Sequence, residues 1–195
     1  MDKGKTALLM VDVQQAFDDE SWGERNNPEA ETKMAEILAA WRNNNGFILH
    51  VQHRSDNPES LFYPHKESYE IKEDLQPTGK ETAITKKVNS AFIGTNLEEI
   101  LRMNGITTVV IIGLTTPHCI STTARMSGNL GFSTYVVSDA TAAYELKDPD
   151  GKRIDPETIH SISLATLHGE FAHVVTTAEL MHEFTSQPSR SEEEK

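Results

Sequence analysis

The sequence has one cysteine, Cys119, among its 195 residues. An internal disulfide is therefore excluded, which is typical of proteins from a reducing compartment. No apolar run is long enough to cross a membrane as a helix. The apolar run near the N-terminus is short and ends at Asp12 without a cleavage-site pattern, which favours a first strand over a signal peptide. We therefore expect a cytoplasmic protein.

Basic residues are also few. The chain has 18 Lys and Arg against 30 Asp and Glu, and its formal net charge is −12 at pH 7. Nucleic acids and anionic membranes both require a cationic surface, so neither is expected as the main partner. The polar segment 186–195 carries part of the acidic excess and is predicted to be a disordered tail. The length of 1–185 suits a single domain with one core.

Short apolar runs alternate with segments of helical pattern. Runs of Val, Ile and Leu without strict alternation are typical of strands buried on both faces of a parallel sheet. The strand candidates are 6–13, 47–53, 107–114, 133–140, 172–180, whose end is also compatible with a helix, and the weaker 81–87. The helix candidates are 27–46, 94–105, 119–131 and 155–168. This order predicts an α/β fold, a three-layer αβα sandwich around a mostly parallel central sheet.

One irregular segment, 54–80, is polar, contains three prolines and is too long for a simple connection. Segments of this kind often serve as lids or interface elements.

Reactive side chains follow three of the predicted strands. Asp12 lies near the end of the first, Lys86 and Lys87 end the weak one, and Cys119 follows the most apolar one at the expected start of a helix. The carboxyl ends of parallel strands form the usual binding edge of such sheets. A helix N-terminus and a nearby lysine both favour a thiolate, and an aspartate could take the thiol proton. The alternatives that stay open are a small buried cysteine, an aspartate that caps a helix or lies in a turn, and solvated surface lysines, and the last holds for at least one of the pair.

Four sequence blocks resemble the isochorismatase-like cysteine hydrolases, which include nicotinamidases and N-carbamoylsarcosine amidase. They are LLMVDVQQAF, KKVNSAFIGTNLEEIL, IIGLTTPHCISTTARMSGNLGF, and VVSDATAAY with LATLHGEFAHVVTTAEL. Their order and spacing extend the resemblance over roughly 5–182. It implies a Rossmann-like αβα fold and a metal-independent enzyme that cleaves a C–N bond of a small amide or carbamoyl compound.

The resemblance also implies a catalytic triad. The family aspartate of the D-x-Q motif falls on Asp12, and Gln14 is the second matching position. The family lysine lies four residues before the serine of S-A-F, which here is Ser90, so it falls on Lys86 and not on its neighbour. The family nucleophile falls on Cys119. Asp12 would take the thiol proton, Lys86 would stabilise the thiolate, and an acyl-enzyme would form and be hydrolysed.

A cis peptide bond is implied between Leu114 and Thr115. The backbone N–H groups of Thr115 and Cys119 would then form the oxyanion hole. Pro117 departs from the family pattern, because many relatives carry an aspartate there. It leaves the triad intact but removes one polar side chain near the nucleophile.

No metal and no cofactor are expected. Nicotinamidases of this superfamily bind a metal through Asp-x-His after the second strand, but here the segment is HVQHRSDN. His53 stands in place of the aspartate and Ser55 in place of the histidine, while His50 and His65 do not restore the spacing. The sequence therefore also argues against nicotinamide as the substrate.

The predicted pocket residues are Phe17, Trp22 and His53, with Tyr144 as a further contributor. His118 is not expected to act as a base, because adjacent helical residues point about 100° apart. The resemblance implies a homo-oligomer. Three alternatives stay open: a vinyl-ether hydrolase of the isochorismatase type, a non-catalytic protein that has kept the fold, and a thiol redox sensor, which would lack a resolving cysteine.

Overall fold

The computed structural model describes residues 1–185; the tail predicted at 186–195 lies outside the described residues. The helices are α1 (Ala30–Asn43), α2 (Leu97–Met103), α3 (Ser121–Asn129), α4 (Pro156–Ala165) and α5 (Thr177–Thr185). The strands of the main sheet are β1 (Thr6–Val11), β2 (Phe47–His53), β3 (Thr82–Lys86), β4 (Thr108–Leu114), β5 (Ser133–Ala142) and β8 (His173–Val175). A separate antiparallel pair consists of β6 (Leu146–Lys147) and β7 (Arg153–Ile154).

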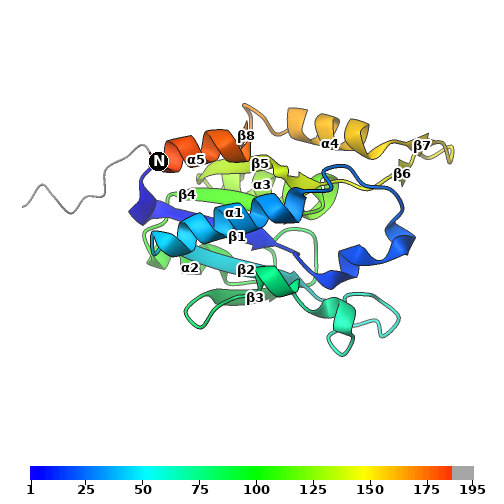
Figure 1. The fold of residues 1–195 in the computed structure, drawn as a ribbon, viewed down its shortest axis with the longest axis horizontal. Helices are drawn as coiled ribbons and strands as arrows, with labels where there is room; N and C mark the ends of the chain where they lie inside the picture. The colour runs from blue at the N-terminus through cyan, green and yellow to red at the C-terminus, as the bar shows by residue number, and fades with distance from the viewer. Residues whose placement is uncertain (186–195) are drawn as a thin grey trace, which may run out of the picture.

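The six strands of the main sheet run parallel in the order β3-β2-β1-β4-β5-β8 (Figure 1). All carboxyl ends therefore lie at one edge of the sheet. The predicted three-layer α/β fold with a parallel central sheet is confirmed. No helix within residues 1–185 is long and apolar enough to cross a membrane.

The central strand β1 is fully buried and serves both layers. Leu8 and Met10 pack into a cluster with α1 and α5, whereas Leu9 and Val11 pack into a second cluster with α2 and α3. Successive side chains of a strand point to opposite faces, so burial of both faces produces the continuous apolar run of the sequence.

The segment 172–180 contains a strand followed by a helix, so the helical alternative for its end is confirmed. β8 ends at Val175, and α5 begins at Thr177. The reason is a capping box: the Glu179 carboxylate accepts from Thr176 N at 2.8 Å, while Thr176 Oγ1 accepts from Glu179 N at 3.3 Å. These reciprocal bonds satisfy N–H groups of the first helical turn and so begin a helix where apolar content alone suggests a strand.

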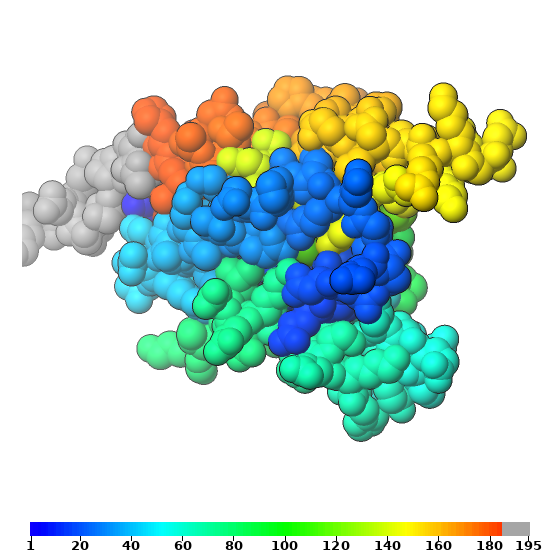
Figure 2. Space-filling model, turned by 45° about the vertical axis from the view of Figure 1, so that its right-hand side comes forward, coloured from blue at the N-terminus to red at the C-terminus, as the bar shows by residue number. Residues whose placement is uncertain are grey.

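The segment 54–80, here called the strap, contains two short 3-10 turns, Glu67–Tyr69 and Glu73–Leu75. It lies beside the chain that follows β1, as Figure 2 shows for the teal and dark-blue surfaces. The contact includes an antiparallel bridge between Gln14 and Ile71. The strap is thus attached next to the carboxyl end of the central strand.

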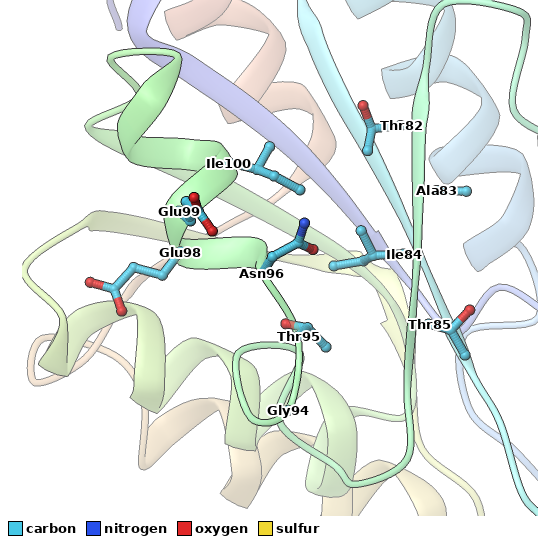
Figure 3. A pocket seen from close by; sticks show the side chains of 10 residues that line it. All are labelled: Thr82, Ala83, Ile84, Thr85, Gly94, Thr95, Asn96, Glu98, Glu99 and Ile100. Atoms are coloured by element: carbon cyan, nitrogen blue, oxygen red, sulfur yellow. The ribbon is translucent and has the colours of Figure 1, made fainter.

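A groove of about 700 Å³ lies along the edge strand β3 and the start of α2. Ile84 and Asn96 face each other across it (Figure 3). None of the predicted catalytic side chains lines this groove.

Candidate active site

Asp12 is held at the carboxyl end of β1 by an unusual backbone conformation. Its φ is +54°, and its N–H donates to the carbonyl of Val51 at 2.8 Å. Gly113 of β4 pairs with Val11 directly before it, and a Cβ at Gly113 would lie 2.0 Å from the Val11 oxygen. A glycine is therefore required for β4 to approach β1 here, and this approach helps to place Asp12 at the sheet edge.

Lys86 ends β3 and directs its side chain inward. Its Nζ lies 2.6 Å from Oδ2 of Asp12, 2.9 Å from Nδ1 of His53 and 3.2 Å from Sγ of Cys119. The three donors of an ammonium thus face three acceptors. The neighbouring Lys87 points outward and pairs with Asp56 at 2.6 Å, with both side chains exposed. The structure therefore brings Lys86, not Lys87, together with Asp12 and Cys119.

Cys119 lies two residues before the start of α3, in a π-helical turn labelled η6 (Thr116–Ile120). The carbonyl of Thr115 accepts from the N–H groups of His118 and Ile120, both at 3.2 Å. Pro117 occupies the first turn, where its missing N–H leaves no bond broken. The peptide bond between Leu114 and Thr115, at the entry to this turn, is cis.

His53 joins this cluster as a neutral imidazole. Burial and the Lys86 ammonium lower the pKa of His53 to about 4. Since Lys86 donates to Nδ1, the ring proton of neutral His53 must reside on Nε2. The side chain of Gln14 fixes the backbone of His53. Its carbonyl oxygen accepts from the N–H of His53 at 2.8 Å, and its amide nitrogen donates to the backbone carbonyls of His53 and Tyr69. Gln14 therefore ties His53 and the strap to the end of β1.

Burial decides the resting charge of the thiol. Burial, assisted by the charge of Asp12, raises the pKa of Cys119 to about 12, although Lys86 opposes the shift. Lys86 acts in the expected direction and lowers this pKa, but desolvation is the larger effect, so the resting sulfur is a thiol whose proton Asp12 can take. Burial also raises the pKa of Asp12 against the opposing effect of Lys86. A carboxylate with a raised pKa is a stronger base, and within residues 1–185 its Oδ1 has no hydrogen-bond partner.

One group of metal-ligating side chains occurs in the described part of the chain. Ligand atoms of Asp12, His53 and Cys119 lie within 4.8 Å of one another. Nζ of Lys86 is within hydrogen-bonding distance of all three residues, so a cationic group already stands among them. The group therefore does not fit a metal ion while Lys86 keeps this position.

Asn89 was not identified from the sequence. It lies in the exposed connection after β3, and its Oδ1 is 3.8 Å from Sγ of Cys119. Its place three residues after Lys86 was the available signal, because a residue that closely follows a strand-end lysine lies near the same sheet edge.

The predicted pocket residues Phe17 and Trp22 belong to an aromatic cluster. Ring centroids of Phe17 lie 5.0 Å from Trp22, 5.3 Å from Phe62 and 6.1 Å from Tyr144. Phe62 of the strap also contacts His53 at 5.1 Å. His53 therefore connects the aromatic cluster to Lys86, whereas within residues 1–185 no ring contact or hydrogen bond joins Phe17 or Trp22 to Cys119 directly.

Two other histidines lie next to the π-turn. Nδ1 of His118 is 3.1 Å from Oγ1 of Thr115, so its hydrogen bond is local and not to the thiol. His160 of α4, to which the sequence assigned no role, is buried and lies 2.8 Å from Oγ1 of Thr116. This contact links α4 to the turn that carries Cys119.

A three-layer sandwich with Asp, Lys and Cys gathered at the carboxyl edge of a parallel sheet defines the class of protein, an α/β enzyme fold. A model of the isochorismatase domain matches residues 6–179. The chain is 58% identical to the isochorismatase family protein YrdC of Bacillus subtilis, over 92% of this chain and 96% of that protein. This chain therefore belongs to the isochorismatase family, a family of hydrolases.

A solved structure supports the same assignment. The crystal structure of an isochorismatase family protein from Chromobacterium violaceum has a TM-score of 0.90 and 39% identity, and the match covers 93% of this chain and 94% of that one. A more distant relative is a streptothricin hydrolase of Streptomyces noursei, 28% identical over 88% of this chain and 62% of that protein.

Proposed function

We propose that this protein is a metal-independent cysteine hydrolase that cleaves the C–N bond of a small amide or carbamoyl compound. The observation that carries the proposal is the position of Lys86, whose Nζ contacts both the Asp12 carboxylate at 2.6 Å and the Cys119 sulfur at 3.2 Å. A base, a cation and a thiol in mutual contact form the arrangement that nucleophilic attack on a carbonyl requires. Similarity to a streptothricin hydrolase, an enzyme named for a small-molecule substrate, also supports it.

In the first half-reaction Asp12 removes the thiol proton, and Lys86 stabilises the thiolate that forms. The sulfur attacks the carbonyl carbon, and the negative oxygen accepts from the backbone N–H groups of Thr115 and Cys119. The proton held by Asp12 passes to the nitrogen as the C–N bond breaks. An amine or ammonia leaves, and a thioester remains on Cys119.

In the second half-reaction Asp12 removes a proton from water, and the hydroxide attacks the thioester carbonyl. The C–S bond breaks, the acid is released, and the proton returns to the sulfur. Burial suits Asp12 for both steps, because a raised pKa strengthens the carboxylate as a base. His53 stays neutral and keeps an acceptor toward Lys86 throughout.

The test measures ammonia release over a panel of primary amides, ureas and carbamoyl compounds. Cys119→Ala, Asp12→Asn and Lys86→Met should each lower kcat/KM at least about 1,000-fold, since nucleophile and base act as one unit. Lys87→Met is the matched control, because that lysine is exposed and pairs with Asp56, and it should retain activity. Intact-mass measurement should detect an acyl adduct on the wild-type enzyme. Hydrolysis that survives Cys119→Ala would contradict the proposal.

A further inference from the structure

Sγ of Cys119 lies between two polar side chains of opposite character. Nζ of Lys86 is 3.2 Å away and can only donate a hydrogen bond, whereas Oδ1 of Asn89 is 3.8 Å away and can only accept one. Within residues 1–185, the thiol of Cys119 is the sole hydrogen-bond partner of the Asn89 carboxamide oxygen. Asn89 Oδ1 is therefore an exposed acceptor within reach of the thiol, beside the buried carboxylate of Asp12 that takes the thiol proton in the proposed reaction.

The same geometry becomes unfavourable once the thiol is ionised. When the proton moves to Asp12, the Asn89 oxygen faces a thiolate with no hydrogen between them. Because Asn89 is exposed, water donates to this oxygen until a substrate displaces it, and a substrate that covers the oxygen without an N–H incurs the penalty of an unpaired acceptor. A substrate that brings an N–H group to this oxygen removes that penalty at the moment the sulfur becomes nucleophilic.

We propose that Asn89 is a specificity-determining residue that selects carbonyl compounds bearing an N–H on the atom next to the carbonyl carbon. Primary amides and ureido compounds qualify, whereas esters and N,N-disubstituted amides do not. The inference rests on the proposed function, because the carbonyl compound must approach Cys119. Asn89 takes part in no bond making; its oxygen accepts a hydrogen bond from the nitrogen that will leave.

The exposure of Asn89 agrees with this role. The residue is exposed, whereas Asp12, Lys86 and Cys119 are all buried. A side chain at the surface that still reaches the buried sulfur is the one that an arriving molecule meets first. Discrimination of this kind is efficient, because a site that hydrogen-bonds a substrate N–H is left with an unpaired acceptor by an analogue without it.

The test uses alkylating probes, which require no knowledge of the natural substrate. Iodoacetamide carries the N–H groups, and 2-iodo-N,N-dimethylacetamide and methyl iodoacetate lack them. Labelling is unambiguous, because Cys119 is the one cysteine of the chain. Each rate constant, measured at pH 8 by intact mass, is divided by the rate constant for N-acetylcysteine with the same probe. This ratio removes the intrinsic reactivity of the probe.

The wild-type protein should prefer iodoacetamide over both other probes by about tenfold, which corresponds to about 1.4 kcal/mol for one hydrogen bond. Asn89→Leu removes the carboxamide with little change in shape and should reduce the preference to about onefold. Asn89→Ala should give the same result, and its small side chain cannot obstruct the entrance to the site. Asn129→Leu is the control, because Asn129 is exposed at the end of α3, and it should retain the preference.

Equal preferences in the wild-type and Asn89→Leu proteins would overturn the inference. So would an equal slowing of all three probes, because Asn89 would then act on the thiol alone. Thermal unfolding confirms that each variant is folded. The proposed function fails separately: if Asn89 controls the probe preference but no amide is hydrolysed in a Cys119-dependent way, the recognition by Asn89 stands and the hydrolase assignment does not.

Discussion

Nζ of Lys86 lies 2.6 Å from Oδ2 of Asp12, and the two side chains are 0% and 1% exposed. A fully buried ion pair carries a large desolvation cost, which the attraction between its members offsets only while both are present. This pair therefore connects stability with the proposed chemistry.

Removing one partner of this pair should destabilise the fold strongly. Lys86→Met and Asp12→Asn should each lower the free energy of unfolding by about 3–5 kcal/mol, because each leaves an uncompensated buried charge. The double variant Asp12→Asn/Lys86→Met should lose only about 1–2 kcal/mol and remain inactive. Urea unfolding at pH 7.5 measures all three values. Additive losses in the double variant would contradict this account.

The reactivity of Cys119 should follow a high pKa. Because burial raises the pKa of the thiol to about 12, the iodoacetamide rate should rise about tenfold per pH unit from pH 7 to 10 without a plateau. Asp12→Asn removes a charge that raises this pKa, so the variant should react faster at pH 8. A wild-type plateau beginning below pH 9 would show that the resting thiol is more acidic than its burial implies.

Gly113 should tolerate no side chain. Gly113→Ala places a Cβ 2.0 Å from the Val11 oxygen at a φ of +125°, so it should cost about 4 kcal/mol or more and displace Asp12. Gly105→Ala is the matched control, since Gly105 has φ +66° but nothing within 4 Å of its Cβ position. The control should cost about 1–2 kcal/mol from backbone strain alone. Thermal unfolding compares the two; equal costs would rule out the proposed contact with Val11.

Glu81 should contribute stability that acid removes. Burial alone would raise the pKa of Glu81, but hydrogen bonds from Arg42, Thr78 and His50 lower it to about 2. A depressed folded-state pKa means that this contribution is complete above the ordinary pKa of 4.5 and is lost as pH falls toward 2. Glu81→Gln should cost about 1–3 kcal/mol at pH 7. In melting curves from pH 7 to 2, the gap from wild type should narrow below pH 4.5; a constant gap would argue against this linkage.

Several elements could be predicted from local patterns because local physics produces them. The apolar runs 6–13, 47–53 and 107–114 correspond to β1, β2 and β4, since strands buried on both faces need apolar residues at nearly every position. The end of 172–180 was left open between strand and helix, and the capping box of Thr176 and Glu179, visible in the sequence as TTAE, decides for the helix. There, the reciprocal hydrogen bonds of these two residues outweighed the apolar pattern around them.

Some residues of the candidate site could also be predicted from the sequence, and others could not. Predicted strand ends pointed to Asp12, to the lysine pair and to Cys119, because parallel strands bring their carboxyl ends to one edge. The resemblance to the family motifs then selected Lys86 over its neighbour. The contact of Asn89 with the sulfur was not predictable, because a loop residue carries no periodic signal. His53 was predicted as a pocket residue after the second strand; its role as an acceptor for Lys86 depends on a side-chain rotamer.

By itself the sequence determined the family, the parallel sheet and the three residues that meet at its edge, since these depend on residue type and spacing along the chain. Only the tertiary structure decided the charge state of the site. Desolvation depends on how much protein surrounds a group, and here it keeps Cys119 protonated and His53 neutral. It also decided that three acceptors surround one ammonium, because Asp12, His53 and Cys119 come from three strands or turns that are distant along the chain.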